Sequence, residues 1–398
     1  MNENIIKSWP ALELNDLPPK HGKIVVAMSG GVDSSVTAAL LVHHGYDVIG
    51  ITLQLYNHGT AINRQGTCCA GQDIHDARKV ADFLGIPHYV LDYETIFKKA
   101  VIDDFVDTYL NGQTPIPCIR CNQKVKFNDL LTLAHDLGAV ALATGHYVRK
   151  KQTQNGPELY QATDKNRDQS YFLFATTRDQ LSFLSFPLGN LQKNEIRALA
   201  KMIGLNVAEK PDSQDICFVP TGNYAGLIKK LQPGSIEEGD IVHEDGRILG
   251  RHNGIINFTI GQRKKLGVIN GDGEPLYVID LDTKKHQVIV GPKSSLYRSY
   301  ITIQDVHWLG DKDIMLCDGF ELFVKIRSTV IPVAATIHPL SKNICRVDFI
   351  VPQASIAPGQ ACVFYKQDRV LGGGWISNNE KVAQKIFQDQ QHIVQAIS

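Results

Sequence analysis

The stretch KIVVAMSGGVDSSVTAALLVHHG (23–45) carries the signal on which the fold prediction depends. Residues 23–28 form a short apolar, β-branched run typical of a strand, and residues 34–45 have the spacing of a helix that ends at a glycine. SGGVDS (29–34) joins them. Its glycines let the backbone approach a ligand, and a helix N-terminus offers N–H groups and a positive dipole end. The sequence therefore predicts a loop that holds an anion, which we interpret as the phosphates of a nucleotide.

This loop differs from the two commonest phosphate-binding motifs. It contains neither G-x-x-x-x-G-K-[ST] nor G-x-G-x-x-G, so neither a Walker loop nor a dinucleotide fingerprint is predicted. The alternative interpretation is an ordinary strand-to-helix turn in which Asp33 caps the helix. The complete six-residue string directly after a strand favours the anion site.

Strand-like and helix-like segments alternate through the first half of the chain, which predicts βαβ units and a parallel α/β sheet. The further segments are strands at 47–55, 88–93 and 139–147 and helices at 73–85, 94–112, 126–138 and 192–204. After about residue 215, Gly- and Pro-rich turns separate short β-like runs without a long helix, which predicts small barrels.

The predicted fold class is α/β: a Rossmann-like parallel-sheet domain, a small β-rich middle domain and a C-terminal β-barrel. The expected boundaries are an N-terminal extension at 1–20, the parallel-sheet domain at 21–215, the middle domain at 216–290, the barrel at 291–377 and a helical C-terminal extension at 378–398.

Composition narrows the class of protein. The 398 residues include 41 Lys and Arg against 41 Asp and Glu, a formal net charge of zero, so any nucleic-acid site must be a local basic patch. No apolar run approaches the roughly 18 residues of a membrane-spanning helix, and the N-terminus lacks a signal-peptide pattern. We expect a soluble cytoplasmic protein with no membrane partner, whose eight cysteines are free thiols.

Two cysteines stand in CIRC (118–121), after a Pro-rich loop and before a helix-like segment. A cysteine near a helix N-terminus, with Arg120 and Lys124 close by, is expected to have a lowered pKa. Cys217 lies far along the chain in DSQDICF (212–218). The remaining cysteines are expected to be small packing residues: Cys68, Cys69, Cys317, Cys345 and Cys362.

SGGVDS resembles the PP-loop of the ATP pyrophosphatases, which adenylate a carbonyl-type oxygen and release pyrophosphate. Within that superfamily, residues 22–375 resemble the bacterial tRNA-specific 2-thiouridylases. The strings that carry the resemblance are SGGVDSS (29–35), TPIPCIRCNQKVKF (114–127), ATGHY (143–147), DQSYFL (168–173), KPDSQDICFVP (210–220), TIGQRKKLGV (259–268) and LGGGWI (371–376).

The resemblance implies an ATP-dependent sulfurtransferase that thiolates C2 of the wobble uridine in Lys, Glu and Gln tRNAs. Cys217 would carry the sulfur as a persulfide and Cys121 would be the nucleophile, and the two could close as a disulfide after transfer. A cysteine desulfurase or a sulfur-relay protein would supply the sulfur. Mg²⁺ is expected with ATP, and Asp33 is the one candidate ligand.

Cys118 departs from a common family pattern, because many relatives have Asp at this position. Thiolates at 118, 121 and 217 would also suit a [4Fe–4S] cluster with one open iron. A zinc site is the third interpretation, since no fourth ligand lies at motif spacing. The persulfide pair comes first and the cluster second.

The resemblance also implies ligand contacts. Those to ATP are Ala27, Met28, Ser29, Gly30, Gly31, Val32, Asp33, Ser34, Leu53 and Gly145. Those to tRNA are Ile116, Pro117 and Cys118 beside the target base, together with Arg167, Asp168, Gln169, Arg327, Ser328 and Gln360. From its place after Gly145, His146 could also reach RNA, although a lone histidine is more often a hydrogen-bonded structural residue. From the residues alone, further candidate RNA surfaces are the basic runs 149–151 and 263–265 and the pair Lys325 and Arg327.

Two other functions are alternatives to the thiouridylase. A small-molecule adenylating ligase would keep the ATP chemistry, but an amine nucleophile needs no cysteine. A non-catalytic RNA-binding protein would not need an intact SGGVDS together with both thiols. The thiols therefore favour the thiouridylase over both.

Overall fold

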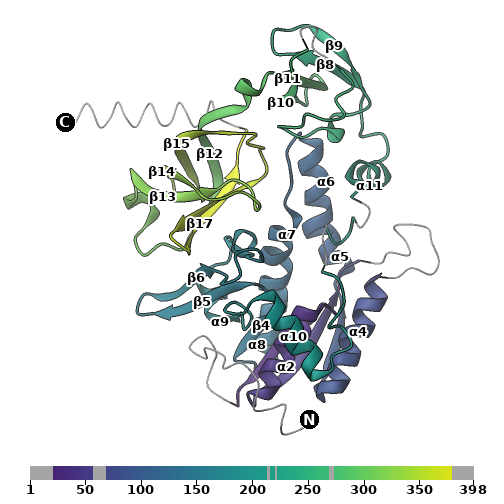
Figure 1. Cartoon of the computed structure of the whole chain (residues 1–398), viewed down its shortest axis with the longest axis vertical. Coiled ribbons are helices and arrows are strands. Elements are labelled where there is room, and N and C mark those ends of the chain that lie inside the picture. Colours follow the sequence, from purple (N-terminus) through teal and green to yellow (C-terminus); the bar gives the residue numbers. More distant parts are fainter. Residues whose placement is uncertain (1–20, 57–68, 213–215, 220–221, 269–272, 379–398) are drawn as a thin grey trace. The chain divides into compact units, whose positions relative to one another are not determined.

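The computed structural model describes residues 21–56, 69–212, 216–219, 222–268 and 273–378 (Figure 1). They fall into two compact units. Of the described residues, the first unit contains those within 21–102, 118–218 and 368–370, and the second those within 103–117, 219–367 and 371–378. The predicted extension at 1–20 and, except for residue 378, the predicted extension at 378–398 lie outside the described residues.

A parallel sheet in the order β3–β2–β1–β4–β7 forms the centre of the first unit. Its strands are β1 (Lys23–Ala27), β2 (Asp47–Gln54), β3 (His88–Asp92), β4 (Ala141–Thr144) and β7 (Leu184–Ser185). The predicted parallel α/β sheet is confirmed. The chain adds β2 and β3 on one side of β1 and then returns with β4 on the other. Sheets of this kind bind ligands at that reversal point, beyond the carboxyl ends of the strands.

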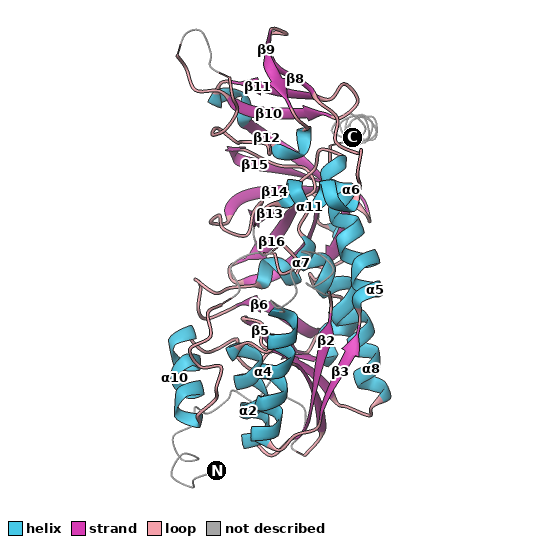
Figure 2. Cartoon of the chain, turned by 90° about the vertical axis from the view of Figure 1, so that its right-hand side faces the viewer, coloured by secondary structure: helices cyan, strands magenta, loops and turns pink. Residues whose placement is uncertain are grey.

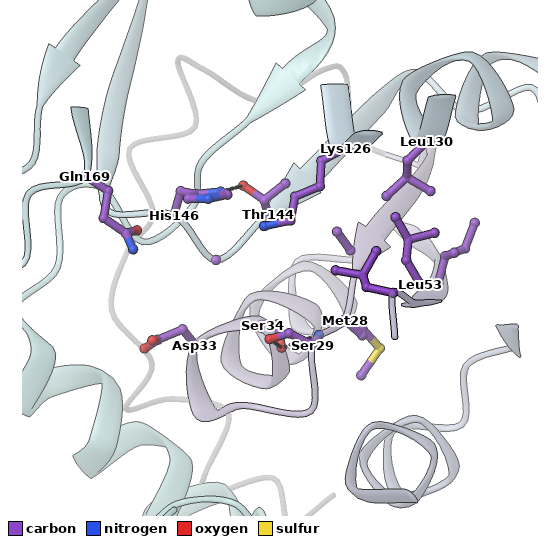
Figure 3. A pocket seen from close by; sticks show the side chains of 14 residues that line it. Met28, Ser29, Asp33, Ser34, Leu53, Lys126, Leu130, Thr144, His146 and Gln169 are labelled. Atoms are coloured by element: carbon purple, nitrogen blue, oxygen red, sulfur yellow. Dashed lines mark hydrogen bonds between the residues drawn. The ribbon is translucent and has the colours of Figure 1, made fainter. Parts of the chain in front are cut away.

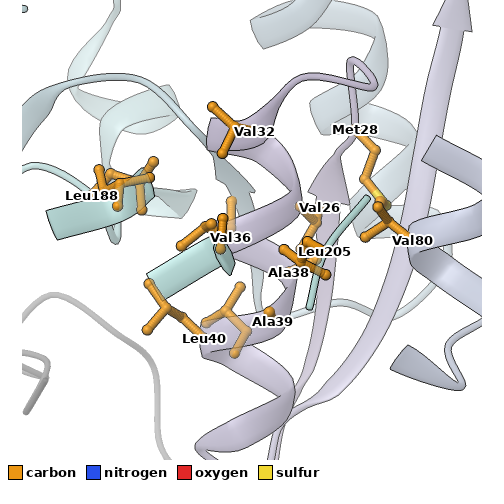
Figure 4. Close-up of a cluster of buried hydrophobic side chains, with 14 of the residues drawn as sticks. Val26, Met28, Val32, Val36, Ala38, Ala39, Leu40, Val80, Leu188 and Leu205 are labelled. Atoms are coloured by element: carbon orange, nitrogen blue, oxygen red, sulfur yellow. The ribbon is translucent and has the colours of Figure 1, made fainter. Parts of the chain in front are cut away.

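The apolar run in β1 is explained by helices that cover both faces of the sheet. Val26 and Met28 share a buried cluster with Val36 and Leu40 of α2 (Figure 4), while Val25 is fully buried on the opposite face. Helices α2 (Val32–His43) and α4 (Cys69–Leu84) lie on one face and α8 (Leu131–Asp136) on the other (Figure 2). Burial on both faces is what a parallel sheet requires.

Two helical segments of the first half differ from the predictions. The chain is helical over most of 94–112, but a π-helical turn, η2 (Lys98–Ile102), separates α5 (Glu94–Phe97) from α6 (Asp103–Leu110). The helix expected over 126–138 already begins with α7 (Pro117–Arg120) and continues as the π-helix η3 (Cys121–Leu130). Proline suits a first helical position because its missing N–H is not needed there.

The sequence did not predict a hairpin within the first unit. Strands β5 (Val148–Thr153) and β6 (Gly156–Gln161) pair antiparallel, and β6 pairs in turn with Arg369 and Val370. The remaining helical elements of this unit are η4 (Ser170–Leu173), α9 (Arg178–Phe183) and the predicted helix α10 (Lys193–Ile203). The turn signal Asn155-Gly156 was overlooked, whereas the pairing of β6 with a segment more than 200 residues further along the chain has no local signal.

The second unit contains the two predicted β modules. One is a sheet in the order β10–β11–β8–β9, and the other is an antiparallel barrel of six strands that the pairing of β12 with β17 closes. The strands are β8 (Gly239–His243), β9 (Ile248–His252), β10 (Tyr277–Asp282), β11 (Gln287–Gly291), β12 (Tyr297–Trp308), β13 (Phe320–Lys325), β14 (Val333–Ser341), β15 (Ile344–Ala354), β16 (Ala361–Lys366) and β17 (Arg369–Ile376). Closure leaves the barrel without an exposed sheet edge.

The second half is not purely β as expected. It contains the short helix α11 (Tyr224–Leu231), whose N-terminus is capped where Asn223 accepts a hydrogen bond from the Gly226 N–H. Short 3₁₀ turns also occur at η5 (Ile255–Asn257), η6 (Lys293–Leu296) and η7 (Ile314–Leu316). No helix in the described ranges is long and apolar enough to cross a membrane.

Candidate nucleotide and thiol site

The SGGVDS loop (29–34) leaves the carboxyl end of β1 and opens α2. Gly30 has a φ of 74°, and a Cβ there would lie 2.1 Å from the main-chain oxygen of Asp73, so only glycine fits. Ser34 Oγ accepts from the Ser29 N–H at 3.1 Å and donates to the Gly31 carbonyl at 3.2 Å. Gly31 is the N-cap, and no side chain caps α2. The helix N-terminus is therefore available to an anion.

A cavity of about 240 Å³ lies beside this loop (Figure 3). Asp33, Ser34 and Ser29 line one side of it, and Lys126, Thr144, His146 and Gln169 face them from the other side. The complete lining is Ala27, Met28, Ser29, Asp33, Ser34, Ile51, Leu53, Leu55, Lys126, Leu130, Thr144, Gly145, His146 and Gln169. The apolar side chains of Ile51, Leu53, Leu55 and Leu130 complete the lining beside these two polar sides, which suits a ligand with a flat apolar part and a charged part.

Most of the predicted ATP contacts meet at this cavity. Gly145 follows β4 and approaches the loop so closely that a Cβ would lie 2.9 Å from the main-chain nitrogen of Ser34. Val32 does not line the cavity but is buried in the cluster beneath α2. Two of the predicted tRNA contacts, His146 and Gln169, line the same cavity. The role of each residue stays a prediction.

His146 is uncharged in this setting. Its Nδ1 lies 2.9 Å from Thr144 Oγ1. Burial, together with the positive charge of Lys126, lowers the pKa of His146 to about 3. A contact from His146 to RNA at neutral pH would therefore be a neutral hydrogen bond rather than an ion pair.

Asp33 does not cap the helix, as the alternative interpretation supposed, but belongs to a partly buried polar network. It accepts a hydrogen bond from the Tyr147 hydroxyl at 2.7 Å, and Lys193 Nζ lies 2.8 Å from each of its carboxylate oxygens. Lys193 also lies 2.8 Å from Asp212. Burial and the neighbouring Asp33 raise the pKa of Tyr147. Nothing in the sequence marked Tyr147 or Lys193 as functional beyond their places in ATGHY and in the predicted helix at 192–204.

The three candidate thiols are free and lie near enough for their charges to interact. Cys121 is buried, whereas Cys118 and Cys217 keep exposed surface although protein atoms desolvate their sulfurs. Desolvation raises the pKa of Cys217 to about 12, with contributions from the sulfurs of Cys121 and Cys118. A hydrogen bond with Tyr56 acts in the opposite direction.

The predicted lowering of the thiol pKa near the helix start is wrong. Burial raises the pKa of both Cys118 and Cys121, and the charge that partly offsets it belongs to Lys126. Arg120 instead donates to Gln123 Oε1 at 3.2 Å. Sequence reasoning missed Lys126, which also lines the cavity.

The other predicted tRNA contacts have partners within their own units. Arg167 pairs with Asp212 at 3.0 Å, and Asp168 accepts from the main-chain N–H groups of Ala162 and Ser170. In the second unit, Arg327 donates to the carbonyl of Ser355. Ser328, Ile116 and Gln360 are half-buried and Pro117 is buried. The structure does not test their role in tRNA binding.

The basic runs differ in exposure. Arg263, Lys264 and Lys265 are exposed, as a binding surface requires. Lys150 and Lys325 are buried, and the Lys150 ammonium donates to the Leu184 carbonyl at 2.5 Å. The interpretation of these two lysines as RNA-binding surface is therefore wrong.

Three of the remaining five cysteines have described side chains. Cys317, Cys345 and Cys362 are buried free thiols in the second unit, and the side chains of Cys68 and Cys69 lie outside the described residues. In the described parts of the chain, no group of three or more His, Cys, Asp or Glu side chains could hold a metal ion. The iron–sulfur and zinc interpretations stay predictions.

The fold and the loop place the chain among nucleotide-using enzymes with a HUP domain. The family model described as "tRNA methyl transferase HUP domain" matches residues 22–221. The model described as "tRNA methyl transferase PRC-barrel domain" matches residues 227–292, and "Aminomethyltransferase beta-barrel domain" matches residues 298–376. ATP binding is implied by the HUP family.

Curated relatives identify the family more closely. The protein named tRNA-specific 2-thiouridylase MnmA from Ruegeria pomeroyi is 58% identical to this chain, over 90% of this chain and 96% of its own length. The protein of that name from Parvibaculum lavamentivorans is also 58% identical, over 92% of this chain and 94% of its own length. The protein of that name from Rhodospirillum centenum is 56% identical over 92% of this chain and 94% of its own. The chain belongs to the MnmA family of tRNA-specific 2-thiouridylases and is therefore an enzyme of tRNA modification.

Proposed function

We propose that this chain thiolates C2 of the wobble uridine in Lys, Glu and Gln tRNAs, using ATP and a persulfide on Cys217. The observation that carries the proposal is the position of Lys126. This residue lines the cavity beside the SGGVDS loop, and its charge acts on Cys118, Cys121 and Cys217. The candidate nucleotide site and the candidate thiols therefore border one region of the first unit.

The first step is adenylation of the uridine. The C2 oxygen of a base turned out of its stack attacks the α-phosphorus of ATP, and pyrophosphate leaves. The N–H groups and dipole at the start of α2 hold the phosphates, and Ile51, Leu53 and Leu55 supply an apolar wall for adenine. In the product the C2 oxygen carries AMP, so AMP can leave when a nucleophile attacks C2.

The second step transfers the sulfur. The terminal sulfur of the Cys217 persulfide attacks C2, and AMP leaves with the C2 oxygen. The Cys121 thiolate then attacks Sγ of Cys217, the bond between the two persulfide sulfurs breaks, and 2-thiouridine is released. The resulting Cys121–Cys217 disulfide requires a dithiol reductant before the next cycle. Lys126 favours the thiolate of Cys121, which burial opposes.

Among the described residues, the cavity offers Mg²⁺ the carboxylate of Asp33, whose oxygens also contact Lys193 and Tyr147. Asp33 is the carboxylate among the described residues that line the cavity, and Mg²⁺ in nucleotide sites takes one or two carboxylates together with phosphate oxygens and water. Bound there, the ion would neutralise charge on the leaving pyrophosphate. The described residues assemble no ligand set for a cluster, so no step is derived through one.

The partners follow from the same chemistry. The substrate is a tRNA. A cysteine desulfurase or a sulfur-relay protein must regenerate the persulfide after each cycle. We place the reaction in the cytoplasm. The name of the family model that matches residues 22–221 refers to methyl transfer. Two thiols beside an anion-binding loop support sulfur transfer instead. A small-molecule adenylating ligase is the rival, because it would use the same loop.

A thiolation assay tests the proposal. Protein prepared in air or anaerobically is mixed with unmodified Glu-type tRNA, Mg·ATP, cysteine, a desulfurase and a dithiol, and 2-thiouridine is measured by mass spectrometry after digestion. We expect product from both preparations. Product from the anaerobic, iron-containing sample alone would assign the mechanism to a cluster on Cys118, Cys121 and Cys217. AMP formation without tRNA, and no 2-thiouridine, would indicate the ligase.

Variants separate the steps of the reaction. Cys121→Ser and Cys217→Ser should abolish thiolation and leave ATP and tRNA binding nearly unchanged, whereas Asp33→Ala should weaken AMP formation and spare tRNA binding. Cys317→Ala, which removes a buried thiol of the second unit, is the matched control and should remain active. Near-normal thiolation by either serine variant would contradict the assignment of the pair.

A further inference from the structure

A short segment of the second unit, residues 113–117, leads directly into the CIRC motif. It contains Ile116 and Pro117, two of the residues predicted to lie beside the target base, and Pro117 is the first residue of α7. The segment follows α6, in which Phe105 is fully buried, and the ring of Phe105 lies 6.0 Å from that of Tyr224. The helix before the segment is thus fixed to α11 of the same unit.

A tight turn of the barrel lies at the other side of this segment. Residues 357–360 form a β-turn, which a hydrogen bond of 3.2 Å closes between its first carbonyl and its last N–H. Pro358 occupies the second position and Gly359, with a φ of 84°, the third. This is the pattern of a type II turn. The Gly359 N–H donates to the carbonyl of Ile376 at 2.9 Å, at the end of β17, so the turn is fixed to the barrel.

The turn and the segment are joined through their backbones. The Thr114 N–H donates to the Pro358 carbonyl at 2.7 Å, and this carbonyl belongs to the central peptide of the turn. Type I and type II turns differ in the orientation of that peptide. The hydrogen bond therefore depends on the type of turn, and a glycine at the third position is what favours type II.

Gly359 also leaves the space that the segment occupies. A Cβ at this position would lie 2.9 Å from Gln113 Cβ and 3.0 Å from both the main-chain nitrogen and the main-chain oxygen of Thr114. Main-chain atoms cannot swing aside as the end of a long side chain can. A larger residue at position 359 would therefore displace the backbone of the segment itself.

Two prolines transmit such a displacement to the predicted base contacts. Pro115 and Pro117 have fixed φ angles, and a residue that precedes a proline is confined to extended conformations, which restricts both Thr114 and Ile116. A chain with so few free torsions moves as a unit instead of absorbing a shift at one end. The position of Ile116 therefore follows that of the barrel turn.

We propose that Gly359 is a positioning residue, through which the barrel turn 357–360 sets where residues 114–117 meet the target uridine. The inference rests on the proposed function, because it takes Ile116 and Pro117 to lie beside that base. Gln360, a predicted tRNA contact, belongs to the same turn. The tRNA body and the target base would thus be held by two parts of one stiff connection, whose task is to align C2 of the uridine for reaction rather than to add affinity.

The test separates the rate of thiolation from the binding of tRNA. The full chain is given Glu-type tRNA, Mg·ATP, cysteine, a desulfurase and a dithiol, and 2-thiouridine yields kcat and KM, while filter binding gives the Kd for tRNA. In Gly359→Ala we expect kcat to fall about tenfold to a hundredfold, the cost of a small misplacement of reacting groups, and the Kd for tRNA to stay close to that of the wild type.

Gly319→Ala is the matched control. Gly319 belongs to the same barrel and has a φ of 71°, but no atom lies within 4 Å of an added Cβ. It has the same backbone strain without the contact, and its kcat should equal that of the wild type. If Gly359→Ala unfolds, Gly359→Asn takes its place, because asparagine adopts positive φ more readily while its Cβ still meets the segment. It should show the same fall in kcat.

Three results would overturn the proposal. They are near-normal kcat in the variant at 359, an equal loss of kcat in Gly319→Ala, and weaker tRNA binding that accounts for the whole loss of activity. The second would assign the effect to the stability of the barrel, and the third to the contact at Gln360. Absence of 2-thiouridine with the wild type would instead count against the proposed function.

Discussion

Replacing one glycine of the SGGVDS loop should be far more damaging than replacing the other. Gly30 has a φ of 74°, and a Cβ would lie 2.1 Å from the Asp73 carbonyl oxygen. The left-handed backbone costs about 1–2 kcal/mol for a residue with a side chain, and overpacking adds about 1–3 kcal/mol. Gly30→Ala should therefore destabilise the first unit by about 2–5 kcal/mol, which corresponds to roughly 4–20 °C in Tm.

Gly31→Ala is the matched control. Its φ is −91°, and the nearest atom to an added Cβ is Ser29 Oγ at 3.6 Å, an ordinary contact. The gain of about 0.4–1 kcal/mol from a less flexible unfolded chain offsets the poorer capping by alanine, which is of similar size. We expect its Tm to stay close to that of the wild type.

Thermal unfolding, followed with and without α,β-methylene ATP, measures both effects. The wild type should gain stability from the analogue by mass action, while Gly30→Ala should unfold early and gain little. The reasoning fails if the two alanine variants unfold at the same temperature, or if Gly30→Ala retains the full gain from the analogue. Either result would mean that the Asp73 carbonyl yields to the added Cβ at little cost.

Three further predictions concern titrating groups. Lys126→Met should slow alkylation of Cys121 several-fold at about pH 8, because the charge that is lost favours the thiolate. Lys126→Arg keeps the charge and should preserve the rate. Equal alkylation rates in the two variants would contradict the role of the Lys126 charge. Alkylation of Cys217 should keep rising beyond the ordinary pKa of 9.0, since its pKa is raised to about 12; a plateau near 9 would be inconsistent with that shift. The depressed pKa of His146, about 3 against the ordinary 6.5, contributes stability that is complete above pH 6.5 and is lost as the pH falls toward 3. His146→Gln should therefore show a shallower loss of Tm over this range, and an unchanged profile would exclude the buried neutral ring as its source.

The parallel sheet could be predicted because its determinants are local. Each strand is an apolar run of a few residues, and each is followed by a helix with its own spacing and terminus, as in the segment from Lys23 to Gly45. The position of the loop follows from the same pattern. Where a strand turns directly into a helix through two glycines, the loop must lie at the carboxyl end of the strand and at the N-terminus of the helix. The hairpin of β5 and β6 is itself local, with Thr153 opposite Gly156, and Asn155-Gly156 was a signal for its turn; only its pairing with Arg369 and Val370 could not be predicted from neighbouring residues.

The polar network around Asp33 could not be predicted for the same reason. Lys193 and Asp212 lie far from Asp33 in sequence, and neither stands in a recognisable motif of charges. A lysine in the first turn of a helix even opposes the helix dipole, so local reasoning would place it on a solvated surface. Its burial becomes favourable only because two carboxylates from separate segments meet its ammonium.

The thiols show how the winding of a helix can reverse an electrostatic prediction. Neighbours in sequence pointed to Arg120 and Lys124, but Cys121 begins the π-helix η3. In a π-helix the N–H of residue i+5 bonds to the carbonyl of residue i, and Lys126 stands five residues after Cys121. The winding thus brings a more distant cation near the sulfur, while the packing of the same helix desolvates it. Burial outweighs the charge, so the pKa of Cys121 stays raised although Lys126 opposes the shift, which is why the Lys126 variants report on the site more directly than changes at Arg120 would.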